Sequence, residues 1–388
     1  MDLRLSEEQQ SLIDTAYRFA QNEWEPRTLE IDESNRFPLW LWEKFRELNW
    51  CGLLIPEEYG GAGLSMLDAC LLMEAAVHGG GDVGSALTWG SHVTIGSVPI
   101  LTCGNEAQKE KFLPKFASGE WMSCFMLTEP NVGSDAAGIE TTAELKGDYY
   151  LVNGTKTFIT NAAKADWGML MASTDRSKKA RGITAFMVDM HADGVTVGEP
   201  FDKIGPRGSE QSEVHFDNVK IPVEDRILEE GEGFIKVGLT NLAYERTGLG
   251  PMWTGVQGYS IDLAVKYANE REQFGHKISC YSQIRERIAQ MRIDYDISKL
   301  LMYQAACKVD CGEDAMVAAS EYKVFNSRAS MQNAIEAMQI FGGYSLIKEY
   351  KIERSLRDAK LATIGAGSEQ MIMEIIARAT VGGRSLTI

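Results

Sequence analysis

The sequence lacks the features that would place it in several large classes of protein. Nowhere in its 388 residues does an apolar run approach the ~20 residues that a membrane-spanning helix needs. Its first residues show neither an apolar signal core nor a basic amphipathic presequence. Basic residues are outnumbered, 39 against 55 acidic ones, and the net charge of −16 is dispersed along the chain. We therefore expect a cytoplasmic protein without a nucleic-acid-binding surface.

Patterns for metal binding and for a disulfide framework are missing too. The seven cysteines are scattered and odd in number, and the five histidines show no metal-ligand spacing. Cys307 and Cys311 lie four residues apart, but no histidine or second cysteine pair completes a site with them. Buried, reduced thiols are the simpler interpretation, and we expect no metal ion.

Length and local pattern predict a chain of several domains with a large apolar core. Residues 1–120 show helical spacing, residues 121–230 are rich in β-forming runs, and residues 231–388 return to helical spacing. The C-terminal helices have lengths that suit a bundle. The predicted fold class is α+β, mainly α, with an N-terminal helical domain, a middle antiparallel β domain and a C-terminal helical bundle.

Local signals place several elements within these domains. Ser6 and Gln9 form a capping-box pattern, and Pro38 suits the first turn of a helix. Asn153-Gly154 lies between two β-rich runs and predicts the turn of a hairpin. Further helices are expected at about 66–78, 84–102, 106–117, 234–273, 280–311, 314–341 and 367–382.

Five separate runs carry the chemical information. The first, residues 125–135, ends a β segment in a Pro/Gly turn with small polar donors. The other four are residues 158–161, 203–209, 271–275 and 339–343. In order and approximate spacing, the five runs resemble the acyl-CoA dehydrogenase family, flavoenzymes that remove two hydrogens from an acyl thioester. The resemblance covers essentially the whole chain and implies that family's fold, with a C-terminal four-helix bundle.

The resemblance also implies FAD as the cofactor. Residues 125–128 would line the flavin ring, with Thr128 at its polar edge, and Arg271 would reach the FAD pyrophosphate of a neighbouring subunit. The residues implied in cofactor binding are Phe125, Met126, Leu127, Thr128, Ser134, Phe158, Thr160, Arg271, Phe274, Tyr281, Gln339, Gly342, Gly343, Ser368 and Gln370. No Gly-x-Gly-x-x-Gly fingerprint opens a βαβ unit, so the flavin is not expected to be held as in a Rossmann fold. The family further implies a homotetramer and an electron-transfer flavoprotein as partner. Tyr281-Ser282 departs from the family, which commonly has an aromatic residue followed by glutamine there.

The residues Ile364-Gly365-Ala366-Gly367-Ser368 stand where most family members carry their catalytic glutamate in a loop. Ala366 cannot accept a proton, although its backbone N–H can still bind the thioester oxygen. The loop resembles that of the isovaleryl-CoA dehydrogenase subgroup, whose base lies on a C-terminal helix, and Glu245 occupies that helical position. We predict Glu245 as the base, with a pKa raised by burial. The alternative is a solvated charge paired with Arg246 or Lys236.

The same loop bears on the substrate. Gly365-Ala366 replaces a bulkier pair, which widens the pocket near Cα and Cβ and favours a short branched or alicyclic acyl-CoA. Trp89 would shorten the acyl tunnel, or else it belongs to the core. The implied substrate contacts are Ser134, Asn241, Tyr244, Arg246, Gly365, Gly367 and Trp89, of which Asn241 shares one helical face with Glu245.

Two other functions are weighed. The same fold could reduce an enoyl thioester, as crotonobetainyl-CoA reductases do, or act as a desulfinase. A non-enzymatic relic that binds flavin or a partner is disfavoured, because Arg271 and Thr128 are retained.

Overall fold

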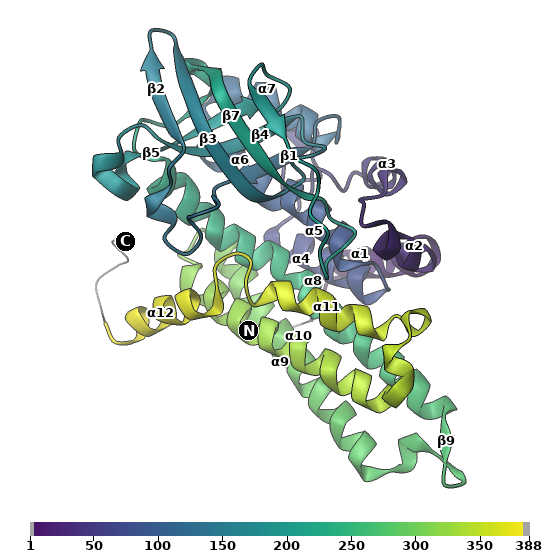
Figure 1. Ribbon diagram of the computed structural model, residues 1–388. Coiled ribbons are helices and arrows are strands. Elements are labelled where there is room, and N and C mark those ends of the chain that lie inside the picture. Colours follow the sequence, from purple (N-terminus) through teal and green to yellow (C-terminus); the bar gives the residue numbers. More distant parts are fainter. Residues whose placement is uncertain (1–3, 383–388) are drawn as a thin grey trace.

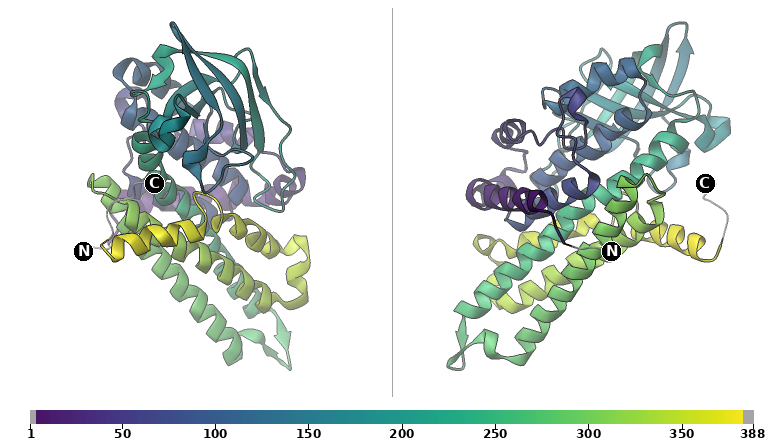
Figure 2. Two further views of the ribbon diagram at one scale, coloured as in Figure 1. Left: turned by 60° about the vertical axis from the view of Figure 1, so that its left-hand side comes forward. Right: turned by 180° about the vertical axis from the view of Figure 1, so that it is seen from behind.

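The computed structural model describes residues 4–382. A twisted β sheet and a bundle of long helices lie at opposite ends of the molecule, and the N-terminal helices pack beside their junction (Figure 1). Figure 2 shows the same arrangement from two further sides. The predicted α+β class is confirmed.

The N-terminal part is helical. The capping box is confirmed, because Gln9 N donates to Ser6 Oγ at 3.1 Å. The helix predicted at 84–102 is interrupted by a π-helical segment, His92–Gly96. The bounds are α1 (Glu7–Phe19), α2 (Thr28–Ser34), α3 (Leu39–Glu47), α4 (Met66–His78), α5 (Val83–Ser91), α6 (Val98–Cys103) and α7 (Glu106–Ala117).

The middle part is one mixed sheet with the strand order β6-β7-β3-β2-β4-β5-β8, and β1 pairs with β4. Most neighbours are antiparallel, whereas β1 and β2 run parallel to β4. The strands are β1 (Ser123–Met126), β2 (Thr142–Lys146), β3 (Tyr149–Thr160), β4 (Trp167–Ser173), β5 (Ile183–Asp189), β6 (Val195–Val197), β7 (Gln211–Pro222) and β8 (Arg226–Ile227).

The hairpin predicted at Asn153-Gly154 is wrong. Both residues lie inside β3, where the register against β7 shifts between Val152 and Gly154. A Cβ on Gly154 would lie 2.4 Å from Thr141 Oγ1, so the glycine serves close strand packing rather than a turn. The chain instead turns at Gly147, with φ +72°, between β2 and β3.

The C-terminal part contains α8 (Leu239–Glu270), α9 (Ser282–Asp310), α10 (Met316–Phe341), α11 (Ile352–Ala362) and α12 (Glu369–Thr380), with the short strands β9 (Glu272–Gln273) and β10 (His276–Lys277) at the tip. The sequence analysis set no bounds for a helix at α11. Buried side chains tie α8 to α10: Gln257 Nε2 donates to Asn326 Oδ1 at 2.7 Å. Pro251 cannot donate to the carbonyl of Thr247, which accepts from the Cys70 thiol at 3.5 Å instead.

Two further findings concern membranes and thiols. Within residues 4–382 no helix is long and apolar enough to cross a membrane, and no group of three or more His, Cys, Asp or Glu side chains could hold a metal ion. All seven cysteines are free. The prediction of buried thiols is wrong for Cys280, Cys307 and Cys311, which are exposed.

Candidate active site

Glu245 lies on α8 near the loop that joins α11 to α12. This yellow loop lies at the junction of the sheet and the helical bundle (Figure 1, and Figure 2, left). The Glu245 carboxylate has no hydrogen bond or ion pair with any of residues 4–382. Burial raises its pKa to about 7, against the opposing effect of Arg246 and Lys323. A carboxyl group with a pKa near neutrality and no protein partner is suited to proton transfer.

Two buried cations hold the backbone of this loop. Arg246 Nε donates to the carbonyl of Ala366 at 3.2 Å, and Lys323 Nζ donates to the carbonyl of Gly367 at 2.6 Å. Ala366 has φ +57° and Gly367 has φ +96°. In the described part of the chain, the N–H groups of these two residues have no acceptor, so they are available to a ligand.

Arg246 was predicted as a substrate contact, but its described contacts are with the protein. Besides the Ala366 carbonyl, it donates to Ser320 Oγ at 3.2 Å and to Met316 Sδ at 3.0 Å. Arg246 therefore contacts the backbone of the loop. It forms no ion pair with Glu245, so the contacts do not support the alternative of a solvated Glu245–Arg246 pair.

Asn241 lies one helical turn before Glu245 on the same face of α8. Its side chain is 2% exposed, and Oδ1 has no hydrogen-bond partner among the described residues. Gly248, one turn after Glu245, packs closely on the π-helical segment, since a Cβ there would lie 2.5 Å from Thr94 Cγ2. On this face of α8, Glu245 therefore has the unpaired Asn241 Oδ1 one turn before it and the close contact between Gly248 and Thr94 one turn after it.

The end of β1 forms a second cluster of predicted residues. The N–H groups of Leu127 and Thr128 have no acceptor in residues 4–382, and neither does the Thr128 hydroxyl. The carbonyl of Leu127 accepts from Lys156 Nζ at 2.9 Å, and the carbonyl of Thr128 accepts from Thr157 N at 2.9 Å. Residues of β3 thus hold the two carbonyls of this segment, while its N–H groups and the Thr128 hydroxyl remain free to bind a flat polar ligand.

A buried ion pair supports this segment, and sequence reasoning missed it. Lys156 Nζ lies 2.8 Å from Glu129 Oε1, and the two side chains are 0% and 2% exposed. Glu129 also accepts from the N–H groups of Glu140 and Thr141. Burial by itself raises the pKa of Glu129, but the pair with Lys156 and the hydrogen bonds lower it overall. The only sequence signal would have been a lysine at an inward position of a strand.

Phe158 and Thr160, two more of the predicted cofactor residues, lie at the end of β3 beside this cluster. Phe158 has φ +57° and is 63% exposed, with its ring 5.3 Å from that of Phe201. Thr160 Oγ1 accepts from Gln211 Nε2 at 3.0 Å. An exposed aromatic side chain in the left-handed region is unusual for a free surface and is consistent with a ligand-binding role.

A further group of the predicted cofactor residues meets at the far tip of the bundle. Arg271, Phe274, Tyr281 and the pair Gly342-Gly343 line one hollow of about 550 Å³. The guanidinium of Arg271 lies 5.6 Å from the Tyr344 ring, and the Tyr281 hydroxyl donates to the carbonyl of Gln273 at 2.7 Å. Gln339 is exposed in the last turn of α10 beside this hollow. Figure 1 places β9, next to Arg271, far from the loop after α11.

Several predicted residues do not join either cluster. Trp89 is 0% exposed, donates to the carbonyl of Trp50 at 2.7 Å and stacks on Phe45, which supports its alternative assignment to the core. Tyr244 packs with a separate apolar cluster that includes Met66. Ser134 and Gln370 are exposed, and Ser368 is the N-cap residue before α12.

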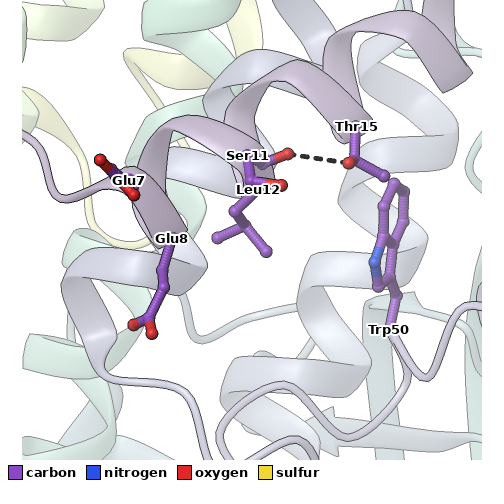
Figure 3. A pocket seen from close by; sticks show the side chains of 6 residues that line it. All are labelled: Glu7, Glu8, Ser11, Leu12, Thr15 and Trp50. Carbon is purple, nitrogen blue, oxygen red and sulfur yellow. Dashed lines mark hydrogen bonds between the residues drawn. The ribbon is translucent and has the colours of Figure 1, made fainter.

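A second hollow of about 460 Å³ lies elsewhere, on α1 (Figure 3). It is lined by Glu7, Glu8, Ser11, Leu12, Thr15 and Trp50. None of the predicted site residues contributes to it.

Comparisons with known proteins show the family of this chain. Three family models match, described as the acyl-CoA dehydrogenase N-terminal domain over residues 6–120, middle domain over residues 124–219 and C-terminal domain over residues 231–381. A 3-(aryl)acrylate reductase of Clostridium sporogenes is 39% identical, covering 95% of this chain and 98% of that protein. The caffeyl-CoA reductase–Etf complex subunit CarC of Acetobacterium woodii is 37% identical, covering 96% and 97%. A mitochondrial isovaleryl-CoA dehydrogenase of Oryza sativa is 35% identical, covering 97% and 92%.

Solved structures lead to the same family. Butyryl-CoA dehydrogenase of Megasphaera elsdenii superposes with a TM-score of 0.95 at 35% identity, covering 98% of this chain and 100% of that one. An FAD complex of PigA superposes with a TM-score of 0.94 at 29% identity, covering 99% and 100%. The chain therefore belongs to the acyl-CoA dehydrogenase family of flavin-dependent oxidoreductases.

Proposed function

We propose that this protein is an FAD-dependent acyl-CoA dehydrogenase in which Glu245 removes the α-proton of the thioester. One observation carries the proposal: a half-buried carboxyl group without a protein partner among the described residues lies on α8, near a loop whose own residue at the usual base position is Ala366. The loop itself contains no glutamate or aspartate, and Glu369, the first residue of α12, accepts from Arg328 Nε at 2.9 Å.

The chain's own residues can perform the proton step. With a pKa of about 7, Glu245 is substantially ionised at neutral pH and strong enough as a base to assist removal of a weakly acidic proton. The free N–H of Ala366, in a loop that Arg246 holds at the next peptide group, can donate to the thioester oxygen as negative charge develops there. A bound FAD would supply the hydride acceptor for Cβ.

We further propose that the acyl group is short and branched or alicyclic. Residues 365–367 carry no side-chain atom beyond Cβ, so this wall leaves room beside Cα and Cβ. The unpartnered Oδ1 of Asn241 adds one polar atom to the helix face beside the base.

The cofactor residues support a proposal about assembly. One chain carries the flavin-edge residues at the end of β1 and the Arg271 hollow at the opposite end of the bundle (Figure 1). We propose that Arg271 serves the FAD of a neighbouring subunit in a homotetramer, and that an electron-transfer flavoprotein removes the electrons. Exposed apolar side chains around the hollow, Phe274 at 93% and Leu346 at 76%, are consistent with a covered surface.

Subunit mixing tests this assembly. Arg271→Ala and Glu245→Gln should each be inactive alone, because one loses cofactor affinity and the other loses the base. In mixed oligomers, some sites combine an intact Glu245 with an intact Arg271 from the neighbour, so activity and bound flavin should return. Mixtures that stay inactive, although native mass spectrometry shows mixed oligomers, would refute the shared site.

The base assignment is tested by Glu245→Gln. This variant should keep its flavin and its affinity for acyl-CoA, while the rate of flavin reduction falls by roughly 10²–10⁴-fold, the usual contribution of a general base. Glu270→Gln is the matched control, because Glu270 is an exposed residue at the end of the same helix. A near-normal rate in Glu245→Gln would exclude Glu245 as the base.

A second candidate function is the reverse reaction, reduction of an enoyl thioester, including an aryl-substituted one. The observation that favours it is that two of the relatives, at 39% and 37% identity, are named as reductases. In that direction Glu245 would have to be protonated in order to donate to Cα. The pH dependence distinguishes the directions: the kcat/KM of dehydrogenation rises with pH through about 7, whereas that of reduction falls. A panel of saturated and unsaturated thioesters, assayed with artificial electron acceptors and donors, decides which direction is efficient.

A further inference from the structure

Lys323 is a buried lysine that none of the roles above uses. It lies in the middle of α10 and is 7% exposed, yet no carboxylate among the described residues lies within ion-pair distance of it. Burial and, next, Arg246 lower its pKa to about 8. A lysine is seldom buried unless its charge is used, and the hydrogen bond that Lys323 makes is to the Gly367 carbonyl, at 2.6 Å.

The loop that receives this bond needs support from outside. Ile364 N and Gly365 N both return to the carbonyl of Leu361, after which Ala366 and Gly367 adopt positive φ values. Alanine is disfavoured in that region, so its conformation must be imposed by the surroundings. Arg246 supports the Ala366 carbonyl, while Lys323 supports the next one.

We propose that Lys323 is a positioning residue: its bond to the Gly367 carbonyl, together with the bond from Arg246 to the Ala366 carbonyl, holds the positive-φ backbone of these two residues and thereby keeps the preceding Ala366 N–H turned toward the thioester. The proposal rests on the proposed function, because it assigns a task to the same loop. It also gives Lys323 an electrostatic effect on Glu245, since its ammonium group favours the carboxylate form.

The charges that face this pair come from three helices. Arg246 on α8 and Lys323 on α10 favour ionisation of Glu245, while Glu369 on α12 faces Lys323 and is itself paired with Arg328 on α10. Removing Lys323 leaves Arg246 as the cation that favours the Glu245 carboxylate, so the effect should be partial.

The first test follows the loop rather than activity. Hydrogen exchange of the Ile364 and Gly365 amides, which donate to the Leu361 carbonyl, should speed up at least roughly tenfold in Lys323→Met, the equivalent of one lost charge-assisted hydrogen bond. Lys323→Arg should retain most of the protection. Arg328→Met is the control, because Arg328 is a cation on the same helix but 56% exposed and bound to Glu369 instead of the loop carbonyls. Unchanged exchange in Lys323→Met would overturn the positioning role, even if that variant is inactive.

The second test separates Lys323 from Glu245. In Lys323→Met, the acid limb of the kcat/KM profile should move to higher pH by roughly one unit, the low end of what one nearby opposite charge does. The affinity for a CoA thioester should fall more than the affinity for the matching CoA thioether, which has no carbonyl oxygen to bind. Lys323→Arg should restore both properties. An unmoved acid limb and equal losses for both ligands would overturn the proposal while leaving Glu245 as the base; an active Glu245→Gln enzyme would instead overturn the proposed function itself.

Discussion

Replacing Lys156 by methionine should destabilise the protein strongly and loosen the segment Leu127-Thr128, which is proposed to line the edge of the flavin. The change removes a cation that is 0% exposed and makes two hydrogen bonds, to Leu127 O at 2.9 Å and to Glu129 Oε1 at 2.8 Å. Breaking a buried ion pair by removing one partner costs about 3–5 kcal/mol. Because Glu129 still accepts two backbone N–H groups, we expect the lower end, about 3 kcal/mol.

Urea titration followed by tryptophan fluorescence measures this loss, with release of bound flavin as a local reporter of the 127–128 segment. The double variant Glu129→Gln with Lys156→Met should be less destabilised than the sum of the single variants, because the buried charge that Lys156→Met leaves unpaired is then gone. Lys146→Met is the control: Lys146 and Glu144 form an exposed pair in the same sheet, with side chains 43% and 68% exposed. The reasoning fails if Lys156→Met costs no more than Lys146→Met, or if the two buried substitutions simply add.

Two further perturbations probe the packing around α8. In the folded protein, burial lowers the pKa of His78, but Asp262 and Glu74 outweigh that effect and raise the pKa to about 9. The stability that protonated His78 contributes is therefore present below the unfolded pKa near 6.5 and is lost as pH rises through about 9. His78→Gln should therefore cost about 1–2 kcal/mol in unfolding free energy at pH 6 and much less near pH 10. An equal cost at both pH values would contradict this reasoning. The control variant is His191→Gln, because His191 is exposed. Gly250→Ala should cost about 1–3 kcal/mol in thermal or urea unfolding, because the new Cβ would lie 2.2 Å from the Tyr322 ring, whereas Gly133→Ala meets no atom within 4 Å and should be neutral.

Regular features with a local cause were predictable from the sequence. The capping box at Ser6, the helices at 66–78 and 106–117 and the fold class follow from spacing and capping, which depend on a few neighbouring residues. The hairpin prediction failed because an Asn-Gly pair can form a turn or can allow close packing inside a strand. At residues 153–154 the glycine admits Thr141 of another segment, and no local pattern reveals that contact.

The same distinction, between features with a local cause and contacts between distant segments, applies to the candidate site. Glu245 was predicted by position within a family pattern, and its lack of protein partners is a finding of the fold. Lys156, Glu129 and Lys323 were missed, because a buried charged residue is recognised only when its partner comes from a distant segment. Gly367, which receives the bond from Lys323, lies 44 residues further along the chain. Trp89 was ambiguous for the converse reason, since only the stacking with Phe45 and Trp50 places it in the core.

The proposed placement of the base on α8 changes which part of the site must be rigid. A loop that carries both the carboxylate and the oxyanion N–H has to hold a side chain and a peptide in register with the substrate. Here the carboxylate belongs to a 32-residue helix tied to α10 by Thr254, Gln257 and Asn326, so the loop has to hold only its peptide groups. Backbone contacts from Arg246 and Lys323 meet that need whatever the loop side chains are. It follows that substitutions at Gly365 or Ala366 should change which acyl groups fit with little effect on the pKa of the base, whereas substitutions at Lys323 should change that pKa.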